Sequence, residues 1–105
     1  MKNINVKEQF VGEVILSSKP VFVDFWATWC PPCLAFGPIF EEYATLSSEY
    51  ECVKINVDEL KEVATEYEIK SIPSILLFYK GKVVNKAIGV QSIDSLNNML
   101  KEIKG

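Results

Sequence analysis

The sequence predicts an α/β protein: a central mixed sheet of four to five strands, with four helices distributed over both faces of the sheet. Three observations support this prediction. Apolar runs and amphipathic stretches alternate along the 105 residues. A strand, a helix and a second strand follow one another at the length of a right-handed crossover, which makes the two strands parallel neighbours. A hairpin signal then adds antiparallel strands. Because no repeat or linker interrupts the pattern, one domain over residues 1–105 is expected.

The first predicted helix covers residues 6–18 and precedes a buried strand. Asn5 can cap this helix, with Glu8 three residues later as the reciprocal partner of a capping box. Pro20 ends the helix and begins a strand over residues 21–26. The nearly continuous apolar character of that strand is typical of a central position in a sheet, with both faces buried.

A second helix is expected from the cysteine motif to about residue 50, with Pro38 inside it as the cause of a kink. The same criteria predict the remaining elements, each with its own local signal. They are a strand over residues 52–57, a helix capped by Asp58 and ending near residue 67, two hairpin strands over 74–79 and 82–88 joined by Lys80-Gly81, and a helix over 93–104 capped by Ser92.

The composition excludes several classes of function. The chain has 14 acidic residues against 11 basic ones, all of them Lys, and it contains neither His nor Arg. Without His, a Ser-His-Asp triad, a Cys-His pair and an imidazole zinc site are impossible. Without Arg, at a net charge of −3, nucleic acid is not an expected partner. No segment approaches the roughly 20 apolar residues of a membrane span, and the N-terminus lacks a signal-peptide core. A soluble, cytoplasmic protein is therefore expected.

The most informative motif is Cys30-Pro31-Pro32-Cys33, which lies where a predicted strand leads into a helix. Unpaired amides and the helix dipole favour a thiolate at that helix N-terminus. Cysteines three residues apart on a helix are close enough to form a disulfide, so thiol–disulfide exchange is the leading interpretation. The third cysteine, Cys52, makes the number odd, which argues against a secreted disulfide framework. We interpret Cys52 as a small buried hydrophobe.

A carboxyl group stands in the middle of the apolar strand before the cysteine motif. Burial of Asp24 should raise its pKa by desolvation, and a carboxyl that titrates near neutral pH can act as a general base. The alternative is a structural aspartate that hydrogen-bonds backbone. Lys54 lies among apolar residues of the next strand and is a candidate partner, although a strand lysine can also extend to solvent.

A set of residues, taken in order, matches a known family over essentially the whole chain. These residues are Asp24, the run Trp26-Ala27-Thr28-Trp29-Cys30-Pro31-Pro32-Cys33, Pro38, Lys54, Ile72-Pro73, Gly81 and Gly89. In this order and at this total length they resemble the thioredoxin family.

The resemblance implies the thioredoxin fold and a protein-disulfide reductase that needs no cofactor beyond its redox-active disulfide. Cys30 would attack the substrate disulfide and Cys33 would resolve the mixed disulfide. Asp24 would accept the proton of Cys33, with Lys54 paired to the carboxyl. The implied partners are a thioredoxin reductase and many disulfide-containing proteins, and a monomer is expected. The electron donor of the reductase stays open.

The resemblance also implies a substrate-binding surface. The Ile72–Pro73 peptide bond should be cis, and the backbone of Ile72 should pair with an extended segment of the substrate by strand addition. Trp29, Pro73, Gly89 and Val90 would complete an apolar docking surface for many partner proteins.

Two residues depart from the usual thioredoxin pattern. Pro31 replaces a common Gly, so that Pro31 and Pro32 together remove two amides near the Cys30 sulfur and are expected to tune the redox potential. Leu34 replaces a residue that is often Lys and enlarges the apolar rim. Two other classes of function stay open: a redox-independent interaction or assembly module on the same fold, and a four-thiolate metal site shared by two chains. The single cysteine pair and its prolines make the metal site the poorer of these.

Overall fold

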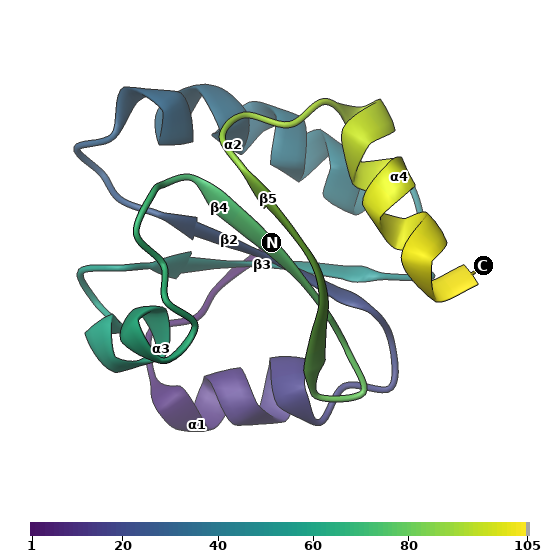
Figure 1. Ribbon diagram of the computed structural model, residues 1–105, viewed down its shortest axis with the longest axis horizontal. Coiled ribbons are helices and arrows are strands. Elements are labelled where there is room, and N and C mark those ends of the chain that lie inside the picture. Colours follow the sequence, from purple (N-terminus) through teal and green to yellow (C-terminus); the bar gives the residue numbers. More distant parts are fainter. Residues whose placement is uncertain (105) are drawn as a thin grey trace.

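Five strands form one mixed sheet in the computed structural model, which describes residues 1–104 (Figure 1). The elements in chain order are β1 (Lys2–Asn3), α1 (Lys7–Phe10), η1 (Val11–Ile15), β2 (Val21–Trp26), α2 (Pro31–Thr45), β3 (Glu51–Asn56), α3 (Lys61–Glu66), β4 (Ser74–Tyr79), β5 (Lys82–Ile88) and α4 (Ile93–Lys104). The element η1 is a π-helical continuation of α1. The predicted α/β fold is therefore confirmed, and Gly105 lies outside the described residues.

The strand order is β1-β3-β2-β4-β5, which places β2 and its parallel neighbour β3 inside the sheet. The edge strand β1 also runs parallel to β3, whereas β4 is antiparallel to both β2 and β5. The predicted crossover from β2 through α2 to β3 and the predicted hairpin of β4 and β5 are both present. Lys80 and Gly81 form the hairpin turn with φ angles of 53° and 81°, a conformation that Gly adopts without strain.

Helices cover both sides of the sheet, with α2 and α4 on one side and α1 and α3 on the other (Figure 1). Each side has its own hydrophobic cluster. Val21, Val23 and Phe25 of β2 pack in the cluster that includes residues of α1, η1 and α3. Phe22 packs in the opposite cluster, with residues of α2 and α4. Because side chains alternate along a strand, Asp24 and Trp26 lie on the same face as Phe22, on the side of the cysteine helix α2.

The first helix differs from its prediction at both ends, because α1 and η1 together cover residues 7–15 and not 6–18. It begins at Lys7 with Val6 as the N-cap, and no side chain caps it, so the predicted capping box of Asn5 and Glu8 is wrong. The amide of Ile4 bonds to the Lys54 carbonyl beside β3, and Val6 is still extended. Asn5 is therefore one residue too early to cap. Sequence patterning also missed β1, whose two residues are too short to show a period.

The ends of two further helices also differ from their predictions. The helix α2 ends at Thr45 rather than near residue 50. After it, the Ser47 hydroxyl accepts a hydrogen bond from the Glu49 amide at 3.0 Å, a local side-chain bond that competes with helix formation. The helix α3 starts after Leu60 and not after Asp58, which lies in the preceding turn. The predicted cap of α4 is present, since the Ser95 amide donates to the Ser92 hydroxyl at 3.1 Å.

Candidate active site

Cys30 and Cys33 form a disulfide at the start of α2, directly after the C-terminal end of β2. Their Cα atoms lie 5.2 Å apart, within the range that a disulfide tolerates. Cys30 is the N-cap residue, and its sulfur accepts a hydrogen bond from the Cys33 amide at 3.3 Å. Pro31 and Pro32 occupy the first two helical positions and have no N–H, so Cys33 supplies the first amide of the helix that can reach this sulfur.

Both cysteines are buried, with 4% of Cys30 and 3% of Cys33 exposed. Residue exposure therefore does not distinguish the attacking from the resolving cysteine. They form a small cluster with Ala27, against which Trp26, Val57 and Ile72 pack. Pro31 and Pro32, which lie between the two cysteines in the sequence, are exposed.

The loop that contains Pro73 lies against the disulfide. The Ile72–Pro73 peptide bond is cis, as the family resemblance implied. The Cys30 sulfur lies 3.7 Å from the carbonyl oxygen of Ile72. The amide of Gly89 donates to the Pro73 carbonyl at 2.8 Å, which ties the end of β5 to the same loop. The structure thus brings Ile72, Pro73 and Gly89 to the cysteine pair, and Val90 follows with 47% of its surface exposed.

Trp29 is 66% exposed, and its indole N–H donates to the Asp58 carboxylate at 2.8 Å. Sequence reasoning assigned Asp58 to a helix cap and missed this contact. The strand register contains a signal for it, because Trp26 and Asn56 end the parallel strands β2 and β3 opposite each other. The two loops that follow therefore leave the sheet side by side, and they carry Trp29 and Asp58.

Asp24 is completely buried in the middle of β2. Neither of its carboxylate oxygens has a hydrogen-bond partner among the described residues. Desolvation raises the pKa of Asp24 to about 7, while the positive charge of Lys54 partly opposes this shift. The structural alternative, a backbone-bonded aspartate, is not what residues 1–104 show.

Lys54 lies opposite Asp24 in the register of β2 and β3. Its ammonium nitrogen is not in an ion pair with that carboxyl but lies 4.1 Å from the centre of the Trp26 ring. The Asp24–Lys54 pair implied by the family resemblance is therefore a pair of strand neighbours without a direct contact. The Trp26 indole N–H, like the Asp24 oxygens, is buried without a partner within the described chain.

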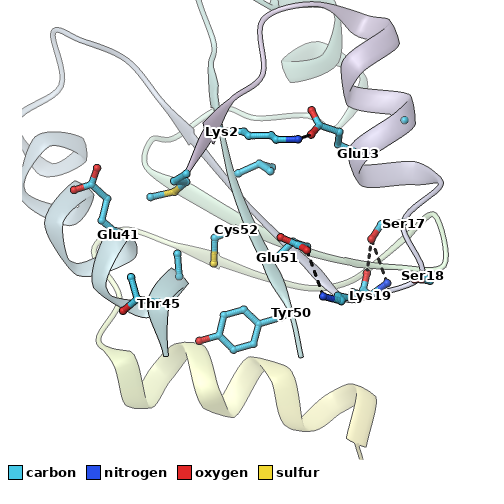
Figure 2. Close-up of a pocket in the computed structure, with 14 residues that line it drawn as sticks. Lys2, Glu13, Ser17, Ser18, Lys19, Glu41, Thr45, Tyr50, Glu51 and Cys52 are labelled. Carbon is cyan, nitrogen blue, oxygen red and sulfur yellow. Dashed lines mark hydrogen bonds and ion pairs between the residues drawn. The ribbon is translucent and has the colours of Figure 1, made fainter. Parts of the chain in front are cut away.

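Cys52 lies apart from the cysteine pair, in the first half of β3. It is 8% exposed and unpaired, and burial raises the pKa of its thiol to about 12. Cys52 lines a groove of about 730 Å³ between η1, β3 and the end of α2, with Glu13, Lys19 and Glu41 among the charged residues around it (Figure 2). No predicted site residue lines this groove, which does not belong to the cysteine site.

The disulfide at the start of α2 defines a class of protein, the thiol–disulfide oxidoreductases, because cysteines one helical turn apart can form and break this bond within the same fold. Within residues 1–104, no cluster of three or more His, Cys, Asp or Glu side chains could hold a metal ion, and no helix combines the length and apolarity needed to cross a bilayer.

Comparisons with known proteins show the family to which this chain belongs. The family model described as Thioredoxin matches residues 2–102. A thioredoxin of Mycoplasmoides gallisepticum is 42% identical over 101 residues, which cover 96% of this chain and 100% of that protein. A thioredoxin of Griffithsia pacifica is 40% identical and covers 94% and 93% of the two chains. The solved thioredoxin of Malassezia sympodialis superposes with a TM-score of 0.86 at 29% identity, covering 97% and 90%.

The chain therefore belongs to the thioredoxin family, and the resemblance stated from the sequence is confirmed. Members of this family are protein-disulfide oxidoreductases that use a redox-active disulfide without a further cofactor.

The buried Asp24 carboxyl predicts a pH-dependent penalty on stability. Its pKa rises from 3.8 to about 7 on folding, so the native state holds a proton that the unfolded state releases between these values. Stability therefore falls as pH rises from 3.8 to 7 and stays low above 7. In the oxidised protein, Asp24→Asn should raise the free energy of unfolding by up to about 4 kcal/mol at pH 8 and by almost nothing below pH 4, as measured by denaturant unfolding. Glu59→Gln, which removes an exposed carboxyl, is the control. If Asp24→Asn stabilises the protein equally at every pH, the raised pKa of Asp24 is contradicted.

Proposed function

We propose that this chain reduces disulfides in other proteins, with Cys30 as the attacking thiolate and Cys33 as the resolving thiol. The observation that carries the proposal is the position of the Cys30 sulfur. This sulfur caps helix α2 and accepts a hydrogen bond from the Cys33 amide. It also lies 3.7 Å from the carbonyl oxygen of Ile72, and the two prolines that follow Cys30 are exposed. An amide and a helix N-terminus both favour negative charge on this sulfur once the disulfide is reduced.

The reaction transfers two electrons from the cysteine pair to the substrate. The Cys30 thiolate attacks one sulfur of the substrate disulfide, and the second substrate sulfur leaves as a thiolate. Cys33 then loses its proton and attacks the Cys30 sulfur, which releases the other substrate thiolate and closes the Cys30–Cys33 disulfide. We propose that a thioredoxin reductase returns two electrons and restores the dithiol.

Asp24 is the proposed proton acceptor for Cys33. It lies on the α2 face of the sheet, and burial raises its pKa to about 7, in the range where a general base is effective near neutral pH. A carboxyl with the ordinary pKa near 4 would be a much weaker base toward a thiol. Lys54 contributes positive charge next to this carboxyl, which keeps part of the ionised form accessible.

Partner proteins are proposed to bind across the loop of Ile72 and Pro73. Within residues 1–104, neither the amide nor the carbonyl of Ile72 has a backbone hydrogen-bond partner, so both can pair with an extended substrate segment. Trp29 and Val90 expose apolar surface, with Pro73 and Gly89 in the same loop cluster. Backbone pairing tolerates many side chains, which suits a reductase with many protein substrates.

We also propose a monomer that works in the cytoplasm. The unpaired Cys52 thiol supports a reducing compartment, because an oxidising one favours an even set of paired cysteines. Nucleic acid is not a proposed partner, for the reason that the chain has no arginine and a net charge of −3.

Single serine variants separate the roles of the three cysteines. In an insulin-reduction assay with a thioredoxin reductase and NADPH, Cys30→Ser and Cys33→Ser should each lose at least about 100-fold in rate. Only Cys33→Ser should accumulate a covalent mixed disulfide with the substrate, detected by mass spectrometry. Cys52→Ser is the matched control and should keep the rate of the unaltered chain. Activity in Cys30→Ser would overturn the assignment, and a partner-binding function that survives replacement of both Cys30 and Cys33 would favour the assembly-module alternative.

The two prolines between the cysteines are proposed to lower the redox potential. Pro31→Gly restores an amide beside the Cys30 sulfur and loosens the turn, and both changes favour the reduced form. The midpoint potential, measured by equilibration with glutathione buffers, should become less negative by about 20 to 30 mV. Pro20→Ala, before β2, is the remote control and should leave the midpoint unchanged. An unshifted midpoint in Pro31→Gly would remove Pro31 from the residues that set the potential.

A further inference from the structure

Three polar or aromatic side chains, Asp24, Trp26 and Lys54, lie on the α2 face of the sheet, and Trp26 packs against the cluster of the cysteine pair. Asp24 and Trp26 are two residues apart on β2 and so share this face, and Lys54 lies opposite Asp24 on β3. A lysine opposite a buried carboxylate would ordinarily form an ion pair, since charges attract strongly away from water. Here the Lys54 ammonium lies 4.1 Å from the centre of the Trp26 ring, and the carboxylate has no partner among the described residues.

We infer that Trp26 is a positioning residue, which holds the Lys54 ammonium over its indole ring and thereby keeps it out of an ion pair with Asp24. Indole is the strongest π partner for an ammonium group, and the attraction grows when both are partly desolvated. Trp26 and Lys54 are both half-buried, which meets that condition. The ring and the carboxyl therefore compete for one ammonium group, and the ring holds it in this structure.

Lys54 is the charged group that faces Asp24. From β3, the same face carries Cys52 and Lys54, and burial keeps the Cys52 thiol protonated. From β4, the register neighbour of Asp24 is the uncharged Ile75. From α2, the titratable groups in this layer are Tyr43 and the cysteines Cys30 and Cys33, which are joined here as a disulfide.

The helix α4 completes this layer with the apolar side chains Leu96, Met99 and Leu100. Lys54 is accordingly the charge that lowers the pKa of Asp24 against the effect of burial. The position of its ammonium then decides how much of that effect Asp24 experiences.

The inference bears on the proposed function, in which Asp24 accepts a proton from Cys33. A direct ion pair within about 4 to 6 Å lowers the pKa of a carboxyl by roughly one to three units. Such a pair would leave Asp24 ionised throughout the neutral range and would make it a weaker base. By keeping the ammonium over its ring, Trp26 keeps the carboxyl able to take up and release a proton near neutral pH.

The test is the pKa of Asp24, followed by the carboxyl carbon chemical shift of the oxidised protein across a pH titration. Trp26→Leu removes the ring and should lower this pKa by about one unit, a tenfold rise in the acid dissociation constant, because the freed ammonium pairs with Asp24. Trp26→Phe keeps a weaker ring and should give a smaller shift in the same direction. Lys54→Gln should raise the pKa.

The Lys54→Gln background is the matched control. There, Trp26→Leu should no longer lower the pKa of Asp24, which separates loss of the cation–π contact from simple entry of water. An unchanged or raised pKa in Trp26→Leu, or a fall that persists in the Lys54→Gln background, would overturn the inference. If Trp26→Leu does not fold, the comparison of Trp26→Phe with the unaltered chain decides, and no fall in the pKa again overturns it.

Because the titration needs no substrate or reductase, it can succeed where the proposed function fails. A pKa that falls in Trp26→Leu without any change in the pH profile of disulfide reduction would keep the inference and remove Asp24 from the mechanism.

Discussion

The parallel pairing of β2 with β3 is the constraint on which the site depends. This register sets Asp24 opposite Lys54 and brings the ends of both strands to one edge of the sheet. The crossover between them is α2, so the same pairing fixes where that helix begins and where its N-cap sulfur lies. The loops that leave the two strands then meet through the hydrogen bond of Trp29 to Asp58. One pairing of two strands thus positions the proposed nucleophile Cys30, the buried Asp24 carboxyl and Trp29 of the proposed docking surface.

The proposed chemistry needs two charged groups, a thiolate at Cys30 and a carboxylate at Asp24, and both residues are buried among apolar side chains. Thiolate chemistry needs an amide and a helix N-terminus at Cys30, and the chain supplies both while two prolines remove the other amides of the first turn. The proposed proton transfer from Cys33 needs a carboxyl that titrates near neutral pH, and burial raises the pKa of Asp24 to about 7. A buried carboxyl whose pKa is raised by desolvation is typical of functional sites, because burial of its charged form costs stability.

The sequence was sufficient for the features that have a local signal. The buried strands, the hairpin, the disulfide pair and the buried carboxyl follow from apolar patterning and residue spacing. The contact of Trp29 with Asp58 and the position of Lys54 over Trp26 have no local signal in the sequence, because each joins side chains that only the pairing of β2 with β3 brings together. The strand β1 was missed for a related reason, since two residues gain strand geometry from pairing with β3 and not from their own pattern.

The central claim is that Asp24 accepts the proton of Cys33 when the mixed disulfide on Cys30 is resolved. The most direct measurement is the rate of substrate release from a mixed disulfide between Cys30 and a peptide, formed by rapid mixing and followed from pH 5.5 to 9. The release rate of the unaltered chain should rise through a step near pH 7, where Asp24 titrates. In Asp24→Asn the step should be lost and release should slow by at least about tenfold. Identical pH profiles for the two proteins would contradict the account.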